Sequence, residues 1–274
     1  GLTMDALDWQ QFRNAIERHS LLSPDAPVGC ALVLSTALYD RDGRFAWSSG
    51  MDHEPHLDDD PLRASAFFSK AFRLLHEAGI PISCVANAAD LTHIPTGTPT
   101  IFLNPTDCDA GEAKAVLAEL AAGRPLLLLG SEGIEGGTTL PPGIAAAFPE
   151  VAGQSIVHAG CGWLRRGPVL GATVAELRQV RQALAGVLPI DLPEGTAGYG
   201  FAMRGDRFIV IEDWREIGRN VELRVRASAA ATSATATGLN EHRPLTIRRD
   251  GTWWVITVPL RPADAELVCL RETP

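Results

Sequence analysis

The 274-residue sequence lacks long hydrophobic runs and paired cysteine motifs. No apolar stretch approaches the roughly 20 residues that a membrane-spanning helix needs, and no signal-peptide pattern is visible. The five cysteines are scattered along the chain, and no CxxC pair occurs among them. Unpaired cysteines in strand-like runs are typical of reduced, mostly buried thiols. We therefore expect a cytoplasmic protein without a membrane partner, a metal or another cofactor.

Basic residues are also in short supply. The sequence has 24 Lys and Arg against 33 Asp and Glu, which gives a net charge of −9. Because proteins bind nucleic-acid backbones by neutralising phosphates with Lys and Arg, this balance argues against a nucleic-acid partner. Phosphate-binding loops, a GxGxxG motif opening a βαβ unit, HExxH and the protein-kinase motifs are absent as well.

The clearest pattern that is present spans residues 100–133. Thr100–Leu103 is short and β-prone, and Leu126–Leu129 is apolar throughout, as a strand buried on both faces must be. Between them, Asp109 and Glu112 have the spacing of a capping box, and apolar residues then recur at helical intervals. The stretch predicts a right-handed βαβ unit in a parallel sheet.

Similar signals predict the other elements of an α/β domain. Strands are expected at Val28–Ser35, Ile82–Val85 and Ile156–His158, and helices at Asp5–His19, Leu62–Ala78 and Val174–Leu188. Residues 36–61 and 130–143 lie between these elements as long loops. The order of the elements predicts a flavodoxin-like parallel sheet.

From about Thr196 the pattern becomes that of short strands without intervening helices. Asp250-Gly251 is a strong hairpin signal, and Thr232–Thr237 reads as a strand or a loop. Six strands are expected, at Gly198–Arg204, Arg207–Ile211, Val221–Ala227, Leu245–Arg248, Thr252–Val258 and Leu267–Leu270. We therefore predict an N-terminal helix and linker (1–27), an α/β domain (28–195) and a small antiparallel β-sandwich domain (196–274).

This layout resembles the C-terminal part of multidomain glycoside hydrolases such as the family 42 β-galactosidases. The segment LLHEAGIPISCVANAADL…TPTIFLNPTDCDAGEAKAVLAELAAGRPLLLLG is similar to their class I glutamine-amidotransferase-like domain. The later segment GYGFAMRGDRFIVIEDW…LTIRRDGTWWVITVPLRPADAELVCL resembles the β-sandwich that follows it. In that family a catalytic barrel precedes both domains, the middle domain helps to oligomerise the enzyme, and its loops can approach a neighbouring active site.

The resemblance implies a non-catalytic portion of a carbohydrate-active protein. The carboxylates that cleave the sugar lie on the barrel in such enzymes, and a barrel alone needs about 200 residues or more. The implied partners are a TIM-barrel catalytic domain or further copies of this chain, with carbohydrate as a candidate ligand. Two alternatives stay open: an autonomous Cys or Ser hydrolase of the amidotransferase-like class, and a free-standing carbohydrate-binding protein.

The sequence has no cysteine at the position expected for an amidotransferase nucleophile. Active relatives carry a Cys in a GxCxG elbow between a strand and a helix. The corresponding strand ends in LGSEG, which puts Glu132 in the nucleophile's place, or Ser131 if the register shifts by one residue. Glycines and prolines follow instead of the helix that an elbow requires. A polar loop is the simpler interpretation.

Two cysteines deserve comparison with a catalytic thiol. Cys161 stands between two glycines, three residues after His158, and a nearby His can lower the pKa of a thiol. However, residues three apart in one strand point to opposite faces, so a turn with a small buried thiol is the simpler interpretation. Cys108 precedes a helix, where the dipole favours a thiolate, but it also reads as a loop residue near a cap. We expect no catalytic residue.

Two regions are candidates for contact with a substrate or partner. His53, Glu54 and His56 belong to an acidic loop that should lie at the carboxyl end of the first strand, where α/β ligand crevices form. Trp214 and Trp254 are the second set, because aromatic faces stack on sugar rings. Trp253 and Trp254 are adjacent and must point to opposite faces of their strand, so one of them belongs to the core.

Overall fold

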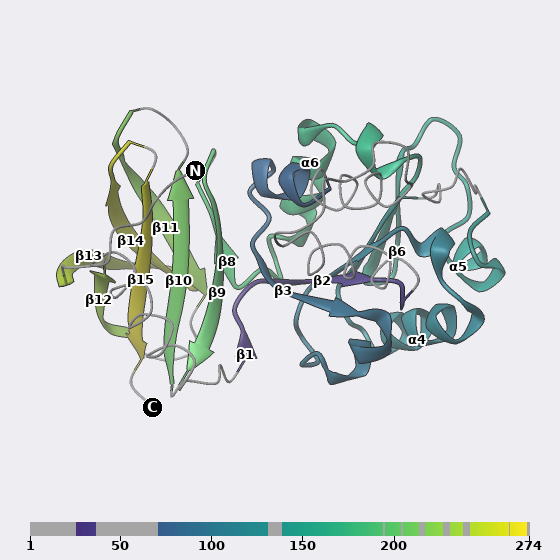
Figure 1. Ribbon diagram of the computed structural model, residues 1–274, viewed down its shortest axis with the longest axis horizontal. Helices are drawn as coiled ribbons and strands as arrows, with labels where there is room; N and C mark the ends of the chain where they lie inside the picture. Colours follow the sequence, from purple (N-terminus) through teal and green to yellow (C-terminus); the bar gives the residue numbers. More distant parts are fainter. Residues whose placement is uncertain are drawn as a thin grey trace, which may run out of the picture.

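The computed structural model has two parts that lie side by side (Figure 1). It describes residues 26–36, 71–130, 139–193, 195–203, 205–213, 217–226, 231–237, 242–262 and 264–272. One part is a six-stranded, mainly parallel sheet with helices, and the other is an antiparallel sheet of nine strands. The predicted combination of an α/β domain and an all-β domain is confirmed.

The parallel sheet has the order expected of a flavodoxin-like fold. Its strands are β2 (Cys30–Leu34), β3 (Ile82–Asn87), β4 (Thr100–Leu103), β5 (Leu126–Leu129) and β7 (Gly162–Arg165), with β6 (Ile156–Ala159) antiparallel at one edge. Across the sheet the order is β3-β2-β4-β5-β7-β6. Counted along the chain, the five parallel strands therefore follow the order 2-1-3-4-5.

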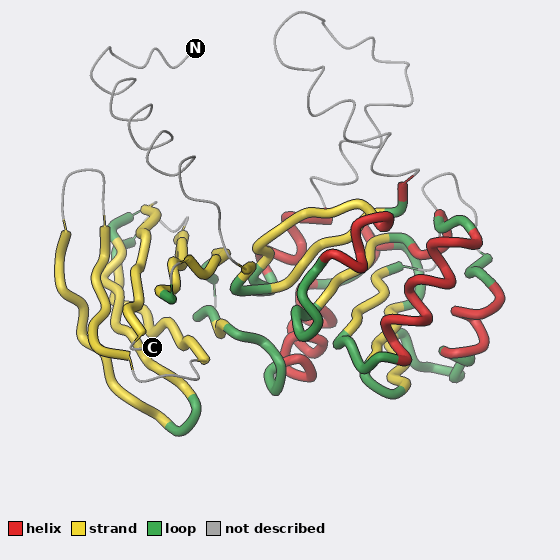
Figure 2. The backbone as a smooth tube through the Cα atoms, turned by 90° about the horizontal axis from the view of Figure 1, so that it is seen from below, coloured by secondary structure: helices red, strands yellow, loops and turns green. Residues whose placement is uncertain are grey.

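The parallel sheet is buried on both faces, as the apolar strands predicted. Helices α4 (Ala110–Ala121) and α5 (Pro142–Ala147) pack on one face, and α6 (Val174–Leu184) and helical residues 71–77 on the other. Figure 2 shows helices on both sides of these strands. Leu127 contributes to one core and Leu128 to the other, and neither side chain is exposed. Each such leucine contributes roughly 1.5–3 kcal/mol to folding.

Local signals fix the start of the main helices. Asp109 Oδ1 accepts a hydrogen bond from Glu112 N at 2.8 Å, and Glu112 Oε2 accepts one from Asp109 N at 3.0 Å. This confirms the predicted capping box of α4. Thr173 and Glu176 form a second capping box at α6. Short 3₁₀ helices follow three strands of the parallel sheet: η1 (Ala88–His93) after β3, η2 (Pro105–Asp107) after β4 and η3 (Val169–Gly171) after β7.

The antiparallel sheet curls around one core. Its strands are β1 (Ala26–Pro27), β8 (Ile190–Asp191), β9 (Ala197–Met203), β10 (Asp206–Asp213), β11 (Arg219–Arg226), β12 (Ala231–Thr237), β13 (His242–Asp250), β14 (Trp253–Leu260) and β15 (Asp264–Glu272). Their order is β1-β9-β10-β15-β12-β13-β14-β11-β8. All six predicted strands are present, and the ambiguous segment 232–237 lies in strand β12. Buried residues from β10, β11, β14 and β15 share the core between the curled halves.

Backbone contacts join the two parts. Strand β1 precedes β2 of the parallel sheet but pairs with β9 of the antiparallel sheet. Val28 N donates to Gly200 O at 2.8 Å, and Gly200 N donates to Ser83 Oγ at 3.1 Å. A Cβ at Gly200 would lie 2.8 Å from Val28 O, so only glycine fits this close approach. On the other side, the Arg226 guanidinium donates to Ala185 O at 2.9 Å.

Several predictions concern residues outside the described part of the chain. They include the helix at Asp5–His19 and the first part of the helix at Leu62–Ala78, of which residues 71–77 are described and helical.

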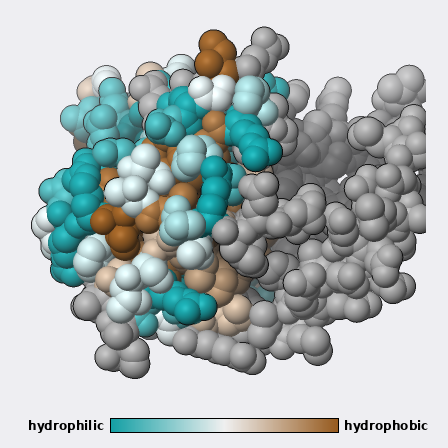
Figure 3. Space-filling model, turned by 90° about the vertical axis from the view of Figure 1, so that its left-hand side faces the viewer, coloured by the Kyte–Doolittle hydropathy of each residue, from teal (hydrophilic) through white to brown (hydrophobic). Residues whose placement is uncertain are grey.

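Among the described helices, none has the length and apolar character needed to cross a membrane. On the face of the β-domain seen in Figure 3, hydrophobic residues form separate patches among hydrophilic ones.

Candidate functional site

The strand order defines one edge of the parallel sheet as a candidate site. The chain moves to β3 on one side of β2 and to β4 on the other, so the carboxyl ends of β2 and β4 form the topological switch point. Asn104 follows β4 in the left-handed conformation, with φ of 47°. Its side chain is fully buried, and neither Oδ1 nor Nδ2 has a hydrogen-bond partner among the described residues. An unpartnered buried amide lowers the free energy of unfolding by about 1–3 kcal/mol. The end of β4 therefore combines an unsatisfied polar side chain with a left-handed backbone conformation.

Neighbouring residues hold the same edge together. Thr36 N donates to Glu112 Oε1 at 2.7 Å, and Thr36 Oγ1 bonds to Asn87 Oδ1 at 2.8 Å. These contacts connect the end of β2 to the end of β3 and to the first turn of α4. Gly130 follows β5 with φ of 104°, and a Cβ there would lie 2.6 Å from Asn104 Oδ1.

The surroundings of Cys108 oppose thiolate formation. Burial raises the pKa of the Cys108 thiol, and the carboxylates of Glu112, Asp107 and Asp109 raise it further. These effects outweigh the helix dipole that the sequence suggested. Cys108 therefore remains a neutral thiol at physiological pH.

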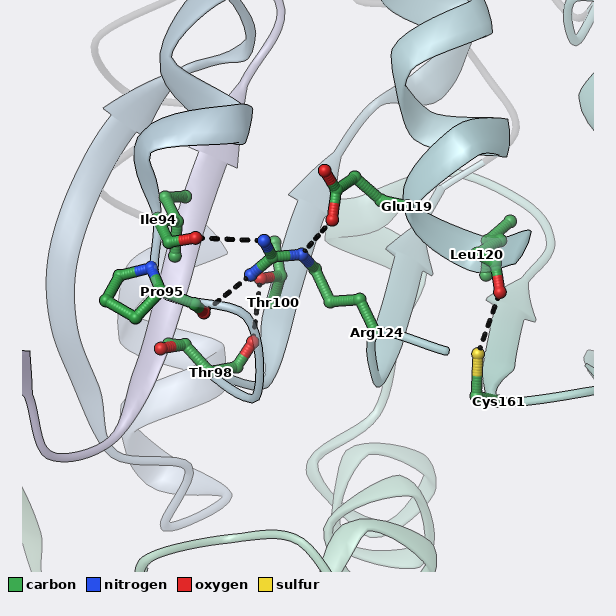
Figure 4. Close-up of polar contacts among 8 residues, drawn as sticks. All are labelled: Ile94, Pro95, Thr98, Thr100, Glu119, Leu120, Arg124 and Cys161. Atoms are coloured by element: carbon green, nitrogen blue, oxygen red, sulfur yellow. Dashed lines mark hydrogen bonds and ion pairs between the residues drawn. The ribbon is translucent and has the colours of Figure 1, made fainter. Parts of the chain in front are cut away.

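Cys161 and His158 lie at the opposite edge of the sheet. Cys161 is in the β6–β7 turn, just before the first residue of β7, and thus at the amino end of the parallel strands. Its Sγ donates to Leu120 O at 3.3 Å (Figure 4). His158 is exposed on β6, and its ring lies 5.0 Å from that of Trp163. Among the described residues, no hydrogen bond or ion pair joins Cys161 to His158.

The two adjacent tryptophans face different surroundings. Trp254 is half-buried and packs against the core of the β-domain, with the Arg249 guanidinium 5.0 Å from its ring centre. Trp253 instead has the Arg226 guanidinium 4.5 Å from its ring. Of the other predicted site residues, Ser131, Glu132, His53, Glu54, His56 and Trp214 lie outside the described residues.

Sequence reasoning missed a groove of about 720 Å³ between the two parts of the chain. It is lined by Arg73, His76, Glu77, Val174, Arg178, Gly195, Thr196 and Ala197. His76 Nε2 lies 3.8 Å from Glu212 Oε2 across the junction. Burial lowers the pKa of His76, while Glu212 and Glu77 act in the opposite direction. No sequence motif predicts this site, because its residues come from two helices, a linker and a strand that lie far apart in the sequence.

Metal-ligating residues do not gather in the described part of the chain. No group of three or more His, Cys, Asp or Glu there could hold a metal ion. All five cysteines lie within it, and none forms a disulfide.

Comparisons with known proteins give matches at the level of fold. No protein-family model matches the sequence, and no curated protein matches it. Gan42B, a GH42 β-galactosidase from G. stearothermophilus, has 12% identity and a TM-score of 0.52, and the match covers 98% of this chain and 45% of that chain. An α-L-fucosidase, isoenzyme 2 from Paenibacillus thiaminolyticus, has 13% identity and a TM-score of 0.61 over 99% of this chain and 53% of its own.

A β-galactosidase from Bacillus circulans sp. alkalophilus extends the pattern, with 11% identity, a TM-score of 0.52 and coverage of 95% and 44%. The chain has the fold of one part of these glycoside hydrolases. It spans about half the length of the solved structures that it matches. The predicted resemblance to family 42 β-galactosidases is confirmed for the fold.

Proposed function

We propose that this chain is a non-catalytic structural portion of a glycoside-hydrolase-type protein. The observation that carries the proposal is its coverage, because 98% of the chain aligns with only 45% of a GH42 β-galactosidase. In the proposed arrangement, an amidotransferase-like domain and a β-sandwich pack on a TIM-barrel catalytic domain or on further copies of the chain. The unpaired state of all five cysteines supports a cytoplasmic location.

The positions of the thiols support this role over that of an autonomous hydrolase. A catalytic Cys in an α/β fold is expected at the carboxyl ends of the strands. Cys161 lies at the amino ends instead, where its thiol bonds to Leu120 O. Burial and three carboxylates raise the pKa of Cys108, and a protonated thiol is a poor nucleophile.

The carboxyl edge is the proposed contact surface for a barrel or a second copy. The segment with His53, Glu54 and His56 follows β2 in the chain, and we retain it as a contact candidate.

Thiol labelling at neutral pH tests the proposal against the hydrolase alternative. The rates are measured for the native chain and for Cys161→Ser and Cys108→Ser, so that each site is assigned by difference. We expect both thiols to react no faster than a free thiol, because burial and three carboxylates raise the pKa of Cys108 and Cys161 bonds to Leu120 O rather than to a basic side chain. A rate far above that of a free thiol at either position would favour the hydrolase.

A further inference from the structure

The groove between the α/β domain and the β-domain has the size and place of a ligand site. Its volume is about 720 Å³, and small-molecule sites typically measure about 300–1,000 Å³ and favour domain junctions. One wall comes from helical residues 71–77 and α6, and the other from the residues that lead into β9. Both parts of the chain are therefore needed to form it.

The polar side chains of the groove carry both signs of charge in close contact. Arg73 Nε donates to Glu77 Oε1 at 2.7 Å, and His76 lies 3.8 Å from Glu212. The side chains of His76 and Glu212 are 25% and 22% exposed, so both remain within reach of a ligand. Arg73 and Arg178 on the groove wall are balanced by Glu77 and by Glu212 beside His76, so the groove does not select for an ionic ligand.

These groups match hydroxyls instead. A hydroxyl donates one hydrogen bond and accepts others, so it can bridge a carboxylate and a guanidinium or imidazole group. Burial lowers the pKa of His76, and the neutral ring offers one donor and one acceptor. Several such groups in one groove favour a molecule with several hydroxyls.

An exposed aromatic side chain follows the groove residues along strand β9. Tyr199 is 42% exposed. It is two residues from Ala197, which lines the groove, and Ala197 pairs with Glu212 on β10. Since alternate residues of a strand share a face, Tyr199 and Glu212 lie on the same side of the sheet. Burial and Glu212 raise the pKa of Tyr199, so its hydroxyl stays protonated and can donate.

We propose that this interdomain groove binds a neutral saccharide, with Glu212 and His76 bonding to ring hydroxyls and Tyr199 stacking on the sugar. Tyrosine combines an apolar ring face, which suits the C–H face of a sugar, with a polar tip. The choice of a sugar rests on the proposed function, whereas the groove and its polar groups are independent of it. A bound sugar would touch both parts of the chain and would hold them together.

Isothermal titration calorimetry of the full chain with galactose and L-fucose tests this inference. We expect at least one sugar to bind in the millimolar range, and Glu212→Gln and Tyr199→Ala each to weaken binding about fivefold or more. Tyr199→Phe keeps the ring and should retain most of the affinity. Glu222→Gln is the matched control, because Glu222 is an exposed carboxylate that pairs with Arg248 elsewhere in the β-domain.

The outcomes separate this inference from the proposed function. Each variant is first shown by thermal unfolding to be folded like the unaltered chain. If no sugar binds at about 50 mM, or if Glu212→Gln and Tyr199→Ala bind as well as the control, the groove proposal is overturned. Neither result touches the non-catalytic role, which hydrolysis of glycosides by the chain would contradict whatever the groove binds.

Discussion

Arg124 shows how one residue can connect distant segments. Its side chain is 2% exposed. Nε bonds to Glu119 at 2.6 Å, and the two terminal nitrogens donate to Pro95 O at 3.0 Å and to Ile94 O at 2.9 Å (Figure 4). The end of α4 is thereby tied to the loop that follows η1. The planar guanidinium holds its N–H donors in a fixed fork, and three of its nitrogens reach these acceptors together.

Substitution of Arg124 should be costly. Arg124→Ala leaves a mostly buried carboxylate and two carbonyls without their donor, so we expect a loss of about 3–5 kcal/mol in the free energy of unfolding. Urea unfolding measures the loss. Arg73→Ala removes the exposed pair with Glu77 and should cost less than about 1 kcal/mol. Equal losses for the two variants would contradict the role assigned to Arg124.

His76 makes stability depend on pH. Its pKa is lowered from the ordinary 6.5, chiefly by burial. The unfolded chain therefore takes up a proton before the folded chain does as the pH falls. Stability is fully present above about pH 6.5 and declines below it.

The measurement compares unfolding free energies of the unaltered chain and His76→Gln at several pH values. Between about pH 7.5 and 5.5 the unaltered chain should lose more stability than the variant, because the variant lacks the group that titrates. Equal pH dependence in both proteins would show that the burial of His76 has no energetic effect. Glu212, Glu77 and Phe72 are the side chains found near the ring.

At the scale of elements, the carboxyl edge of the sheet depends on the fit between β4 and β5. Gly130 has positive φ, and a Cβ there would meet both Asn104 Oδ1 and Val169 Cγ2 at 2.6 Å. Gly97 also has positive φ, but a Cβ there would meet nothing within 4 Å. The pair separates backbone strain from steric conflict.

Gly130→Ala should therefore destabilise the chain more than Gly97→Ala. We expect about 1 kcal/mol for the positive φ at each position, and a further 1–3 kcal/mol or so at Gly130 for the displaced neighbours. Thermal or urea unfolding of both variants gives the difference. A loss at Gly130 no larger than that at Gly97 would mean that the edge yields freely to an added methyl group.

Local sequence patterns predicted most helices and strands, and the elements that they missed have physical reasons. The central strands were predictable because burial on both faces requires a continuous apolar run. The capping box of α4 was predictable because its two residues lie three positions apart in the sequence. Strand β7 was missed because it is four residues long and begins with glycine. Helix α5 was missed because its six residues start with Pro-Gly in a stretch that reads as a loop.

The candidate sites depend on topology more than on local sequence. Asn104 was predictable as the end of a strand, but its burial against Gly130 follows from the pairing of β4 with β5. The groove was not predictable, since His76, Arg178 and Thr196 meet only after the sheet order has brought two helices beside β9. The nucleophile-like spacing of His158 and Cys161 proved uninformative, because the hairpin places the pair at the amino edge.

At the scale of the whole molecule, hydrogen bonds join the two parts of the chain on both sides of their junction. On one side, strand β1 pairs with β9, and Val28 N donates to Gly200 O. On the other side, strand β8 pairs with β11, and the Arg226 guanidinium donates to Ala185 O. The two parts that these contacts join together match one part of larger glycoside hydrolases in fold.

The most direct test of the non-catalytic role is the rate of glycoside hydrolysis by the purified chain alone. Aryl β-galactosides and α-L-fucosides are suitable substrates, chosen from the activities named for structurally similar enzymes. If the chain is non-catalytic, the aryl group is released at the uncatalysed rate from every substrate. Hydrolysis that rises with chain concentration and saturates with substrate would contradict the non-catalytic role.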